Sequence, residues 1–130
     1  MEENSLKRTA LFKTHTALGA RMVGFGGWEM PVLYSGIAQE HLAVREAAGL
    51  FDISHMGEFQ FDGPGALEFL NRMLTNDLTK LKPGSGQYSM LCQANGGVID
   101  DLYAYRLGRD RYLLIVNASR LEVDWIWIKA

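Results

Sequence analysis

The sequence contains a single cysteine, Cys92, so no second thiol is present with which that residue could form an intrachain disulfide. This scarcity of cysteine favours an intracellular, cytoplasmic protein.

The longest strongly apolar run, 112–116, is far shorter than the roughly 18 residues that a membrane-spanning helix needs. The start of the chain, Met1 to Asn4, has no apolar stretch behind its two glutamates. We therefore expect neither a secretory signal nor a mitochondrial transit peptide.

The sequence also lacks an excess of basic charge. Lys and Arg number 13 and Asp and Glu number 15, which gives a formal net charge of -2. The nearest approach to a basic cluster, Arg106 to Arg111, is interrupted by Asp110, so a nucleic-acid groove is not expected. The three histidines are far apart in sequence and none has a Cys or carboxylate at ligand spacing, so no metal site is expected.

The N-terminal part of the chain predicts two helices with extended structure between them. Apolar residues at helical spacing favour a helix over 6–18, with Thr9 as its N-cap, and a second helix beginning at Ser35. Residues 22–33 are expected to be strand and loop, broken by a pair of glycines and by Pro31.

The rest of the chain predicts the order β-α-β-β-β-α. A proline at the first helical position, Pro64, opens one helix, and Ser119 with Glu122 forms a capping box for the last. Strands are expected at 56–61, 86–92, 98–107 and 112–117. The order indicates an α+β fold, in which an antiparallel sheet has its helices on one face.

One strand places a carboxylate among aromatic rings. Alternate residues of a strand share a face, so two sets are expected on opposite sides: Ile99, Asp101, Tyr103 and Tyr105 on one, and Val98, Asp100, Leu102 and Ala104 on the other. The first set suits a flat heterocycle with N–H donors, such as a pterin, because rings stack on it and a carboxylate accepts its hydrogen bonds. A solvent-facing strand of mixed polarity fits the alternation alone slightly better.

Five motifs that occur in order along the chain resemble the N-terminal part of aminomethyltransferase, the T-protein of the glycine cleavage system. They are FGGWEMPV at 25–32, EHLAVR at 40–45, GLFDISHMGE at 49–58, LTND at 74–77 and GGVIDDL at 96–102. The resemblance covers nearly all of this chain and about the first third of the family protein. The last helix ends at Ala130 with no capping residue, and we expect the sequence to be a fragment.

The resemblance implies a three-domain folate-binding fold around a central cavity. Residues 1–52 would belong to the first, incomplete domain, and residues 53–130 would form the domain that carries the folate-contacting aspartate. The family's central aspartate matches Asp101, which would be catalytic and would contact the folate. Further matching positions that line the folate cavity are Met56, Tyr88, Tyr105 and Asn117. Asp100 is expected to point to the other face and to bond locally.

The resemblance also implies an activity in glycine catabolism and one-carbon metabolism. The family enzyme takes an aminomethyl group from the lipoyl arm of its partner, the H-protein. It releases ammonia and transfers the one-carbon unit to tetrahydrofolate. A eukaryotic member would be mitochondrial. Taken alone, the fragment is expected to be inactive, to bind folate weakly and to self-associate.

Three alternatives remain open. Related proteins use folate to demethylate small methylated amines or sulfonium compounds, but they usually depart from the segments 54–56 and 100–101, which this sequence keeps. Others are non-catalytic folate-binding modules that assist iron–sulfur cluster assembly. In the third alternative the chain is an α+β interaction domain, whose aromatic strand face docks a protein.

Overall fold

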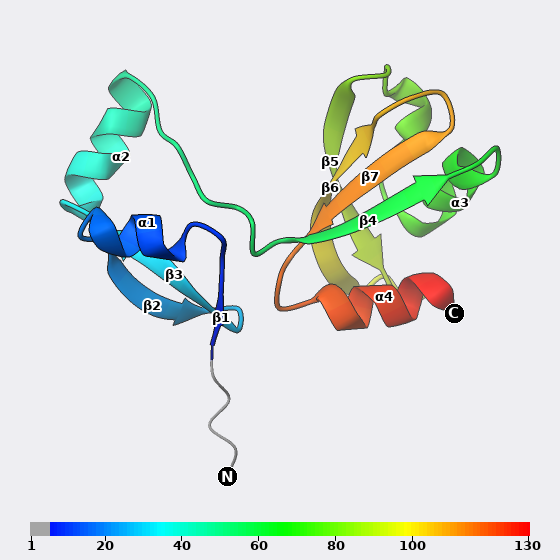
Figure 1. Cartoon of the computed structure of the whole chain (residues 1–130). Coiled ribbons are helices and arrows are strands. Elements are labelled where there is room, and N and C mark those ends of the chain that lie inside the picture. Colours follow the sequence, from blue (N-terminus) through cyan, green and yellow to red (C-terminus); the bar gives the residue numbers. More distant parts are fainter. Residues whose placement is uncertain (1–5) are drawn as a thin grey trace, which may run out of the picture. The chain divides into compact units, whose positions relative to one another are not determined.

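The computed structural model describes residues 6–130; residues 1–5, on which the expectation of no targeting segment rests, lie outside the described part. The chain divides into two compact units, unit 1 up to His55 and unit 2 from Met56 to Ala130 (Figure 1). Along the described part of the chain, no helix combines the length and apolar character that crossing a membrane requires.

Unit 1 contains a small three-stranded sheet and two helices. In chain order its elements are β1 (Lys7–Arg8), α1 (Phe12–Ala17), β2 (Arg21–Phe25), β3 (Trp28–Leu33) and α2 (Ile37–Glu46). The sheet order is β1-β3-β2, with β2 antiparallel and β1 parallel to β3. Gly26 and Gly27 form the tight turn between β2 and β3 with φ of 56° and 83°, which is the left-handed region that glycine enters at little cost.

The prediction of a helix over 6–18 is wrong in its first half. The helix starts at Phe12, and its N-cap, Leu11, makes no side-chain capping bond. Thr9 lies before the N-cap, and its hydroxyl instead donates to Asp52, 43 residues later in the chain.

Two other expectations for unit 1 also fail. Pro31 does not break the extended segment but lies within β3, paired with Met22. The other edge of β3 pairs with β1 only at Trp28 and Glu29, so a proline farther along removes no ladder bond on that edge. Nor does the Ser35 side chain cap α2. No side chain caps α2; the carboxylate of Glu40 instead accepts bonds from the backbone N–H groups of residues 34, 35 and 36, which precede the helix.

A buried aspartate joins separate segments of unit 1. Oδ2 of Asp52 lies 2.8 Å from Nε2 of His15 and accepts a 2.7 Å bond from Thr9. Oδ1 accepts from the backbone N–H and the hydroxyl of Ser54. On the other side of the imidazole, Nδ1 lies 2.7 Å from the Tyr34 hydroxyl. The Asp52 side chain is only 1% exposed, so these bonds replace the water it loses.

Unit 2 is an antiparallel sheet covered on one face by helices. Its elements are β4 (Gly57–Asp62), α3 (Ala66–Met73), a short 3₁₀ helix (Leu78–Lys80), β5 (Ser85–Cys92), β6 (Val98–Arg106), β7 (Arg111–Val116) and α4 (Leu121–Lys129). The strand order is β4-β7-β6-β5, with every neighbouring pair antiparallel. The predicted β-α-β-β-β-α order and α+β class are therefore confirmed.

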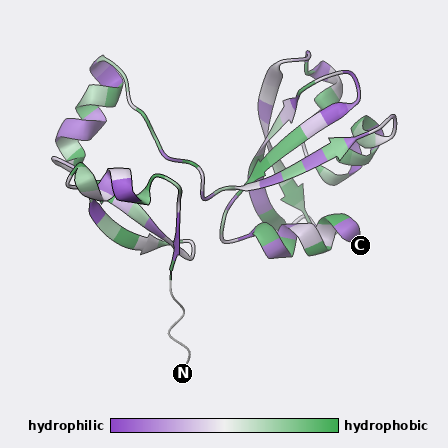
Figure 2. Ribbon diagram, in the orientation of Figure 1, coloured by the Kyte–Doolittle hydropathy of each residue, from purple (hydrophilic) through white to green (hydrophobic). Residues whose placement is uncertain are grey.

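The core of unit 2 lies between the covered sheet face and the helices. Leu70 of α3 and Ile128 of α4 belong to one cluster with Leu102, Leu114 and Val116 from the strands. Buried positions alternate with more exposed ones along β7 and along β6 from Asp101 onward, as expected for a sheet with one buried face. Figure 2 shows that these strands carry both hydrophobic and hydrophilic residues.

Three predictions for unit 2 need correction. The helix α3 begins at Ala66 with Gly65 as its N-cap, so Pro64 lies before the helix and not at its first position. The capping box at Ser119 does not form: α4 begins at Leu121, its N-cap is Arg120, and no side chain caps it. Ile99 does not share the face of Asp101, because a register shift at Leu91/Cys92 interrupts the alternation. A bulge of this kind places two residues of one strand opposite one of its partner. Ile99 is therefore buried in the core, whereas the preceding Val98 is exposed.

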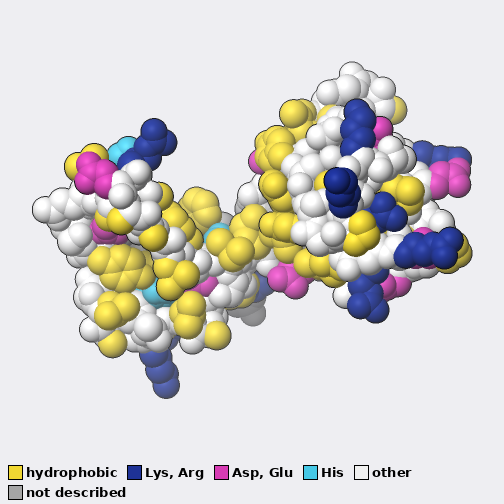
Figure 3. Space-filling model, turned by 90° about the horizontal axis from the view of Figure 1, so that it is seen from above, with side chains coloured by type: hydrophobic (Ala, Val, Ile, Leu, Met, Phe, Trp, Pro, Cys, Tyr) yellow, Lys and Arg dark blue, Asp and Glu magenta, His cyan; other side chains and the backbone are white. Residues whose placement is uncertain are grey.

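Unit 1 has a much thinner core than unit 2. Among residues 6–130, Met30 is the only buried hydrophobic residue that belongs to unit 1. Large hydrophobic side chains on its surface include Leu18, Phe25, Ile37, Leu50, Phe51 and Ile53, and hydrophobic side chains gather over this unit in the face that Figure 3 shows.

Limited proteolysis should distinguish the two units. We expect protease to remove the chain up to about residue 55 and to spare 56–130, because local opening is easiest where few apolar contacts are buried. Mass spectrometry of the resistant product measures the boundary. Cleavage spread evenly over both units would contradict the prediction.

Acid should weaken unit 1 through Asp52. Burial raises the pKa of this carboxyl, but hydrogen bonds from His15, Ser54 and Thr9 outweigh that effect and hold the pKa well below its usual value. Below about pH 4 the unfolded chain then binds more protons than the folded one. The contribution of the Asp52 carboxylate to the free energy of unfolding of unit 1 is therefore complete at neutral pH and is lost as the pH falls.

The variant Asp52→Asn tests this contribution. At pH 7 we expect it to lower the free energy of unfolding of unit 1 by roughly 1.5–3 kcal/mol, the usual value of a hydrogen bond to a charged group. Urea denaturation followed by NMR signals of α1 and β3 gives the measurement, at pH 7 and at pH 3. Glu46→Gln, at an exposed position of α2, is the control. A loss for Asp52→Asn no larger than for Glu46→Gln would refute the role of Asp52.

Candidate functional site

The candidate site lies on the sheet face of unit 2 that the helices leave open. On β6 this face carries Asp101, Tyr103 and Tyr105, which are exposed, while Leu102 and Ala104 between them are buried. The neighbouring strand β5 contributes Tyr88, which is 52% exposed. The face therefore offers one carboxylate and three phenol rings to solvent.

Asp101 is held on both sides by hydrogen bonds. The hydroxyl of Tyr88 donates to its Oδ2 at 2.9 Å, and Nδ2 of Asn117 donates to its Oδ1 at 3.2 Å. The bond to Asp101 is the main cause that raises the pKa of Tyr88 above its usual value, so the phenol stays a donor at neutral pH. An exposed carboxylate is thereby fixed in one orientation with lone pairs left for a ligand.

Gly86 makes room for the tyrosine rings. The rings of Tyr103 and Tyr105 pack together with their centroids 5.0 Å apart. Gly86 pairs with Tyr105 across the sheet, and a Cβ at this position would come within 2.6 Å of the Tyr103 ring and 2.7 Å of the Tyr105 ring. The missing side chain thus lets both rings lie over β5.

The structure groups the five expected site residues within unit 2, but not all equally closely. Tyr88, Asp101 and Asn117 are linked directly by hydrogen bonds. Tyr105 lies on the same face, two positions farther along the strand from Tyr103. Met56 immediately precedes β4, whose first residue pairs with Val116, and so it lies at the end of the sheet where Asn117 follows.

Behind this face lies a buried pair of carboxyl groups. Asp100 is 6% exposed and accepts bonds from the backbone N–H of Asn117 at 3.1 Å and from its Nδ2 at 2.9 Å. Asp124 of α4 has no exposed surface. Burial, and then the neighbouring Asp100, raise the pKa of Asp124 to about 7. The positive charge of Arg120 acts in the opposite direction.

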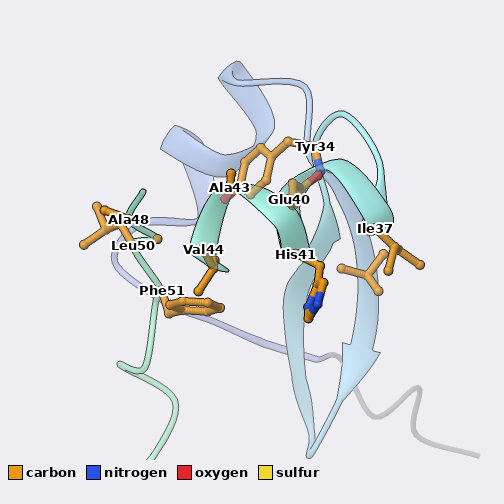
Figure 4. A pocket seen from close by; sticks show the side chains of 11 residues that line it. Tyr34, Ile37, Glu40, His41, Ala43, Val44, Ala48, Leu50 and Phe51 are labelled. Carbon is orange, nitrogen blue, oxygen red and sulfur yellow. The ribbon is translucent and has the colours of Figure 1, made fainter. Parts of the chain in front are cut away.

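A separate hollow lies in unit 1 (Figure 4). Its volume is about 440 Å³, and it lies between β3, α2 and the segment that follows α2. Mainly apolar side chains line it, including Val32, Val44 and Phe51, together with His41 and Glu40. It contains none of the five expected site residues. Within residues 6–130, no three or more His, Cys, Asp or Glu side chains are grouped as metal ligands would be.

Sequence reasoning placed Tyr103 on the face of Asp101 but did not count it among the site residues, and it did not identify Gly86 or Asp124 as parts of this arrangement. Strand alternation already placed Tyr103 on the face of Asp101, so its exposure was accessible from the sequence. The role of Gly86 depends on the cross-strand register, and the position of Asp124 depends on how α4 packs. Neither is visible from local sequence.

Comparison with known proteins gives a consistent result. The family model described as the GCVT N-terminal domain matches residues 11–130, a range that includes all five motifs. An aminomethyltransferase of Symbiobacterium thermophilum is 58% identical over 124 residues, covering 95% of this chain and 33% of that protein. One of Bacillus subtilis is 51% identical over 124 residues, covering 95% of this chain and 34% of its own length.

A solved structure agrees with these matches. The crystal structure of glycine cleavage system aminomethyltransferase T from Bartonella henselae has a TM-score of 0.89 with this chain at 41% sequence identity. The match covers 96% of this chain and 35% of that one. The chain thus spans about a third of the length of the relatives it matches.

Gly86→Ala should disturb the tyrosine rings more than it disturbs the fold. The added methyl group pushes the Tyr103 and Tyr105 rings off β5, and because these rings are partly exposed they can move. We expect the ring NMR signals to shift, with a change in unfolding free energy of about 1 kcal/mol or less. Gly65→Ala, where a Cβ meets nothing within 4 Å, is the matched control. Unchanged ring signals in Gly86→Ala would contradict the assignment.

Proposed function

Because the chain belongs to the GCVT N-terminal domain family, we propose that it supplies the tetrahydrofolate-binding sheet of a glycine cleavage system aminomethyltransferase. The observation that carries the proposal is the fixed carboxylate of Asp101 on an open, tyrosine-lined sheet face. Relatives of 50–58% identity named aminomethyltransferase support it. The chain spans about a third of their length, so we expect this face to form one wall of their site.

The chemistry of the open face suits a reduced pterin. The pyrimidine ring of tetrahydrofolate is flat and its ring system carries several N–H donors, whereas the Asp101 carboxylate has only acceptors. The rings of Tyr103 and Tyr105 give a stacking surface beside it. Tyr88 and Asn117 hold the carboxylate in place, so little freedom remains to be lost on binding. Met56 is proposed to border the folate at the end of the sheet.

In the transfer reaction, Asp101 is proposed to act on a folate amine nitrogen. That nitrogen bonds to the aminomethyl carbon and loses a proton, which the carboxylate can accept or direct. The second folate nitrogen then bonds to the same carbon and loses its own proton. The C–N bond to ammonia and the C–S bond to the lipoyl arm break, each leaving atom takes the bonding pair, and the two folate protons end on ammonia and on the lipoyl thiol. The two folate nitrogens end bridged by the one-carbon unit. A positioned acid–base group of this kind contributes about 10²–10⁴-fold to the rate.

The aminomethyl donor is proposed to be the lipoyl group of an H-protein, because the proposed reaction requires a thiol carrier for the one-carbon unit. In this assignment the partner protein supplies the donor, and unit 2 of this chain supplies part of the folate face. The same face would also serve a folate-dependent demethylase or a non-catalytic folate module, which differ in the donor rather than in the pterin.

Asp101→Asn tests the proposal through binding. Titration with tetrahydrofolate should shift the NMR signals of Tyr88, Asp101, Tyr105 and Asn117 in the unmodified chain. In Asp101→Asn we expect affinity to fall by about tenfold or more, which corresponds to one lost charge-assisted hydrogen bond. Asp62→Asn removes an exposed carboxylate that pairs with Arg111 on the same sheet, and it should leave the titration unchanged.

Two results would reject the proposal. One is an unmodified chain whose open-face signals do not respond to tetrahydrofolate, which would favour a protein-docking role for the tyrosines. The other is an Asp101→Asn variant that binds within about twofold of the unmodified chain, a change too small for a lost charge-assisted bond.

A further inference from the structure

The carboxamide of Asn117 has more acceptors around it than it has hydrogens. Its Nδ2 lies 2.9 Å from Oδ1 of Asp100, 3.0 Å from the backbone oxygen of Asp101 and 3.2 Å from Oδ1 of Asp101. All three neighbours are acceptors, so the NH₂ group must face them. The orientation of the amide is thereby fixed, and its Oδ1 is directed away from the two carboxylates.

Asp100 makes the stronger of these connections. Each of its carboxylate oxygens accepts one donor from the same residue, the backbone N–H of Asn117 at 3.1 Å and the side-chain Nδ2 at 2.9 Å. Asp100 is buried, whereas Asp101 is exposed. A hydrogen bond shielded from water is electrostatically stronger than one with which water competes. Asp100 therefore controls the position of Asn117 more firmly than Asp101 does.

Asp124 completes the arrangement from the helix side. It is fully buried, and neither of its oxygens meets a hydrogen-bond donor among the described residues. Burial and the neighbouring Asp100 raise the pKa of Asp124, so it holds a proton to a higher pH than an exposed aspartate does. A protonated Asp124 can donate that proton toward Asp100, which leaves one negative charge on the side of Asn117. Arg120, whose guanidinium donates to the backbone oxygen of Ile99, is the cation that acts on Asp124.

We propose that Asp100 is a positioning residue: it holds the carboxamide of Asn117 so that Nδ2 fixes the Asp101 carboxylate and Oδ1 stays free to accept from a ligand. The open face would then present two kinds of acceptor side by side, a carboxylate and an amide oxygen, to a heterocycle with adjacent N–H donors. That part of the inference rests on the proposed folate function. The positioning of Asn117 does not.

Two isosteric variants distinguish whether Asn117 is held by the acceptors of Asp100 or by the burial of the Asp100–Asp124 pair. Asp100→Asn replaces one acceptor by an NH₂ group, so that one of the two donors of Asn117 meets another donor. Asp124→Asn removes a carboxyl from the same buried pair but keeps a donor that can face Asp100. Only the first variant should release Asn117.

The readout is the side-chain amide of Asn117 in the full 130-residue chain, observed by ¹⁵N NMR. In the unmodified chain we expect its protons to exchange with D₂O at least about tenfold more slowly than those of Asn95 in an exposed turn. In Asp100→Asn this difference should disappear, and in Asp124→Asn it should persist. Backbone spectra show whether each variant is folded.

Three results would overturn the inference. The first is an Asn117 amide in the unmodified chain that exchanges as fast as that of Asn95, a result that needs no variant to fold. The second is full protection of Asn117 in a folded Asp100→Asn chain. The third is equal loss of protection in both variants, which would mean that burial of the pair, and not the acceptors of Asp100, holds the amide.

Tetrahydrofolate titration of the same samples tests the ligand part separately. We expect affinity to fall about tenfold in Asp100→Asn and to stay within about twofold in Asp124→Asn. If tetrahydrofolate binds none of the samples while Asn117 behaves as expected, the proposed function fails and the positioning role stands. If the unmodified chain and both variants bind equally well, the positioning of Asn117 has no part in binding.

Discussion

Adjacent residues of a strand point to opposite faces of a sheet, and unit 2 depends on how it accommodates two aspartates under that constraint. Asp101 points to the open face, where its charge is solvated. Asp100 points among the residues covered by helices, where an unpaired carboxylate would be costly. The structure resolves this by directing two N–H donors of Asn117 to Asp100 and by placing Asp124 beside it. The open site and its buried support are therefore consequences of a single pair of residues.

The two units solve the problem of a buried carboxylate in opposite ways. In unit 1, donors surround Asp52 and hold its pKa low, so its stabilising contribution is lost as pH falls. In unit 2, Asp124 lacks such donors and its pKa is raised. The folded state then binds the extra proton, so the contribution of Asp124 is greatest below the usual Asp range and is lost as pH rises toward 7. Unit 1 gains a link between distant segments, whereas unit 2 retains a proton.

Much of unit 2 could be predicted from the sequence because its signals are local. Strand alternation and the strand-forming composition of each short segment act over a few residues, and together they give the observed order. Alternation also placed Asp101 and Tyr105 on one face. The errors arose where contacts between residues far apart in the sequence determine the local structure. The bulge at Ile99 depends on the register with β5, and Thr9 lies outside the helix and bonds to Asp52. The capping box at Ser119 failed although its sequence pattern is present.

The buried Asp100–Asp124 pair is difficult to explain as a device for stability. Removing a carboxylate charge from water costs several kcal/mol, and the raised pKa of Asp124 shows that part of this cost remains uncompensated at neutral pH. Apolar residues of similar volume would fill the space beneath β6 at lower cost. They could not, however, accept from both N–H donors of Asn117, and the amide would then be free to turn. The energetic cost of burial falls on Asp100, whose two carboxylate oxygens both accept from Asn117. Asn117 borders the open face, where a fixed side-chain orientation matters for binding.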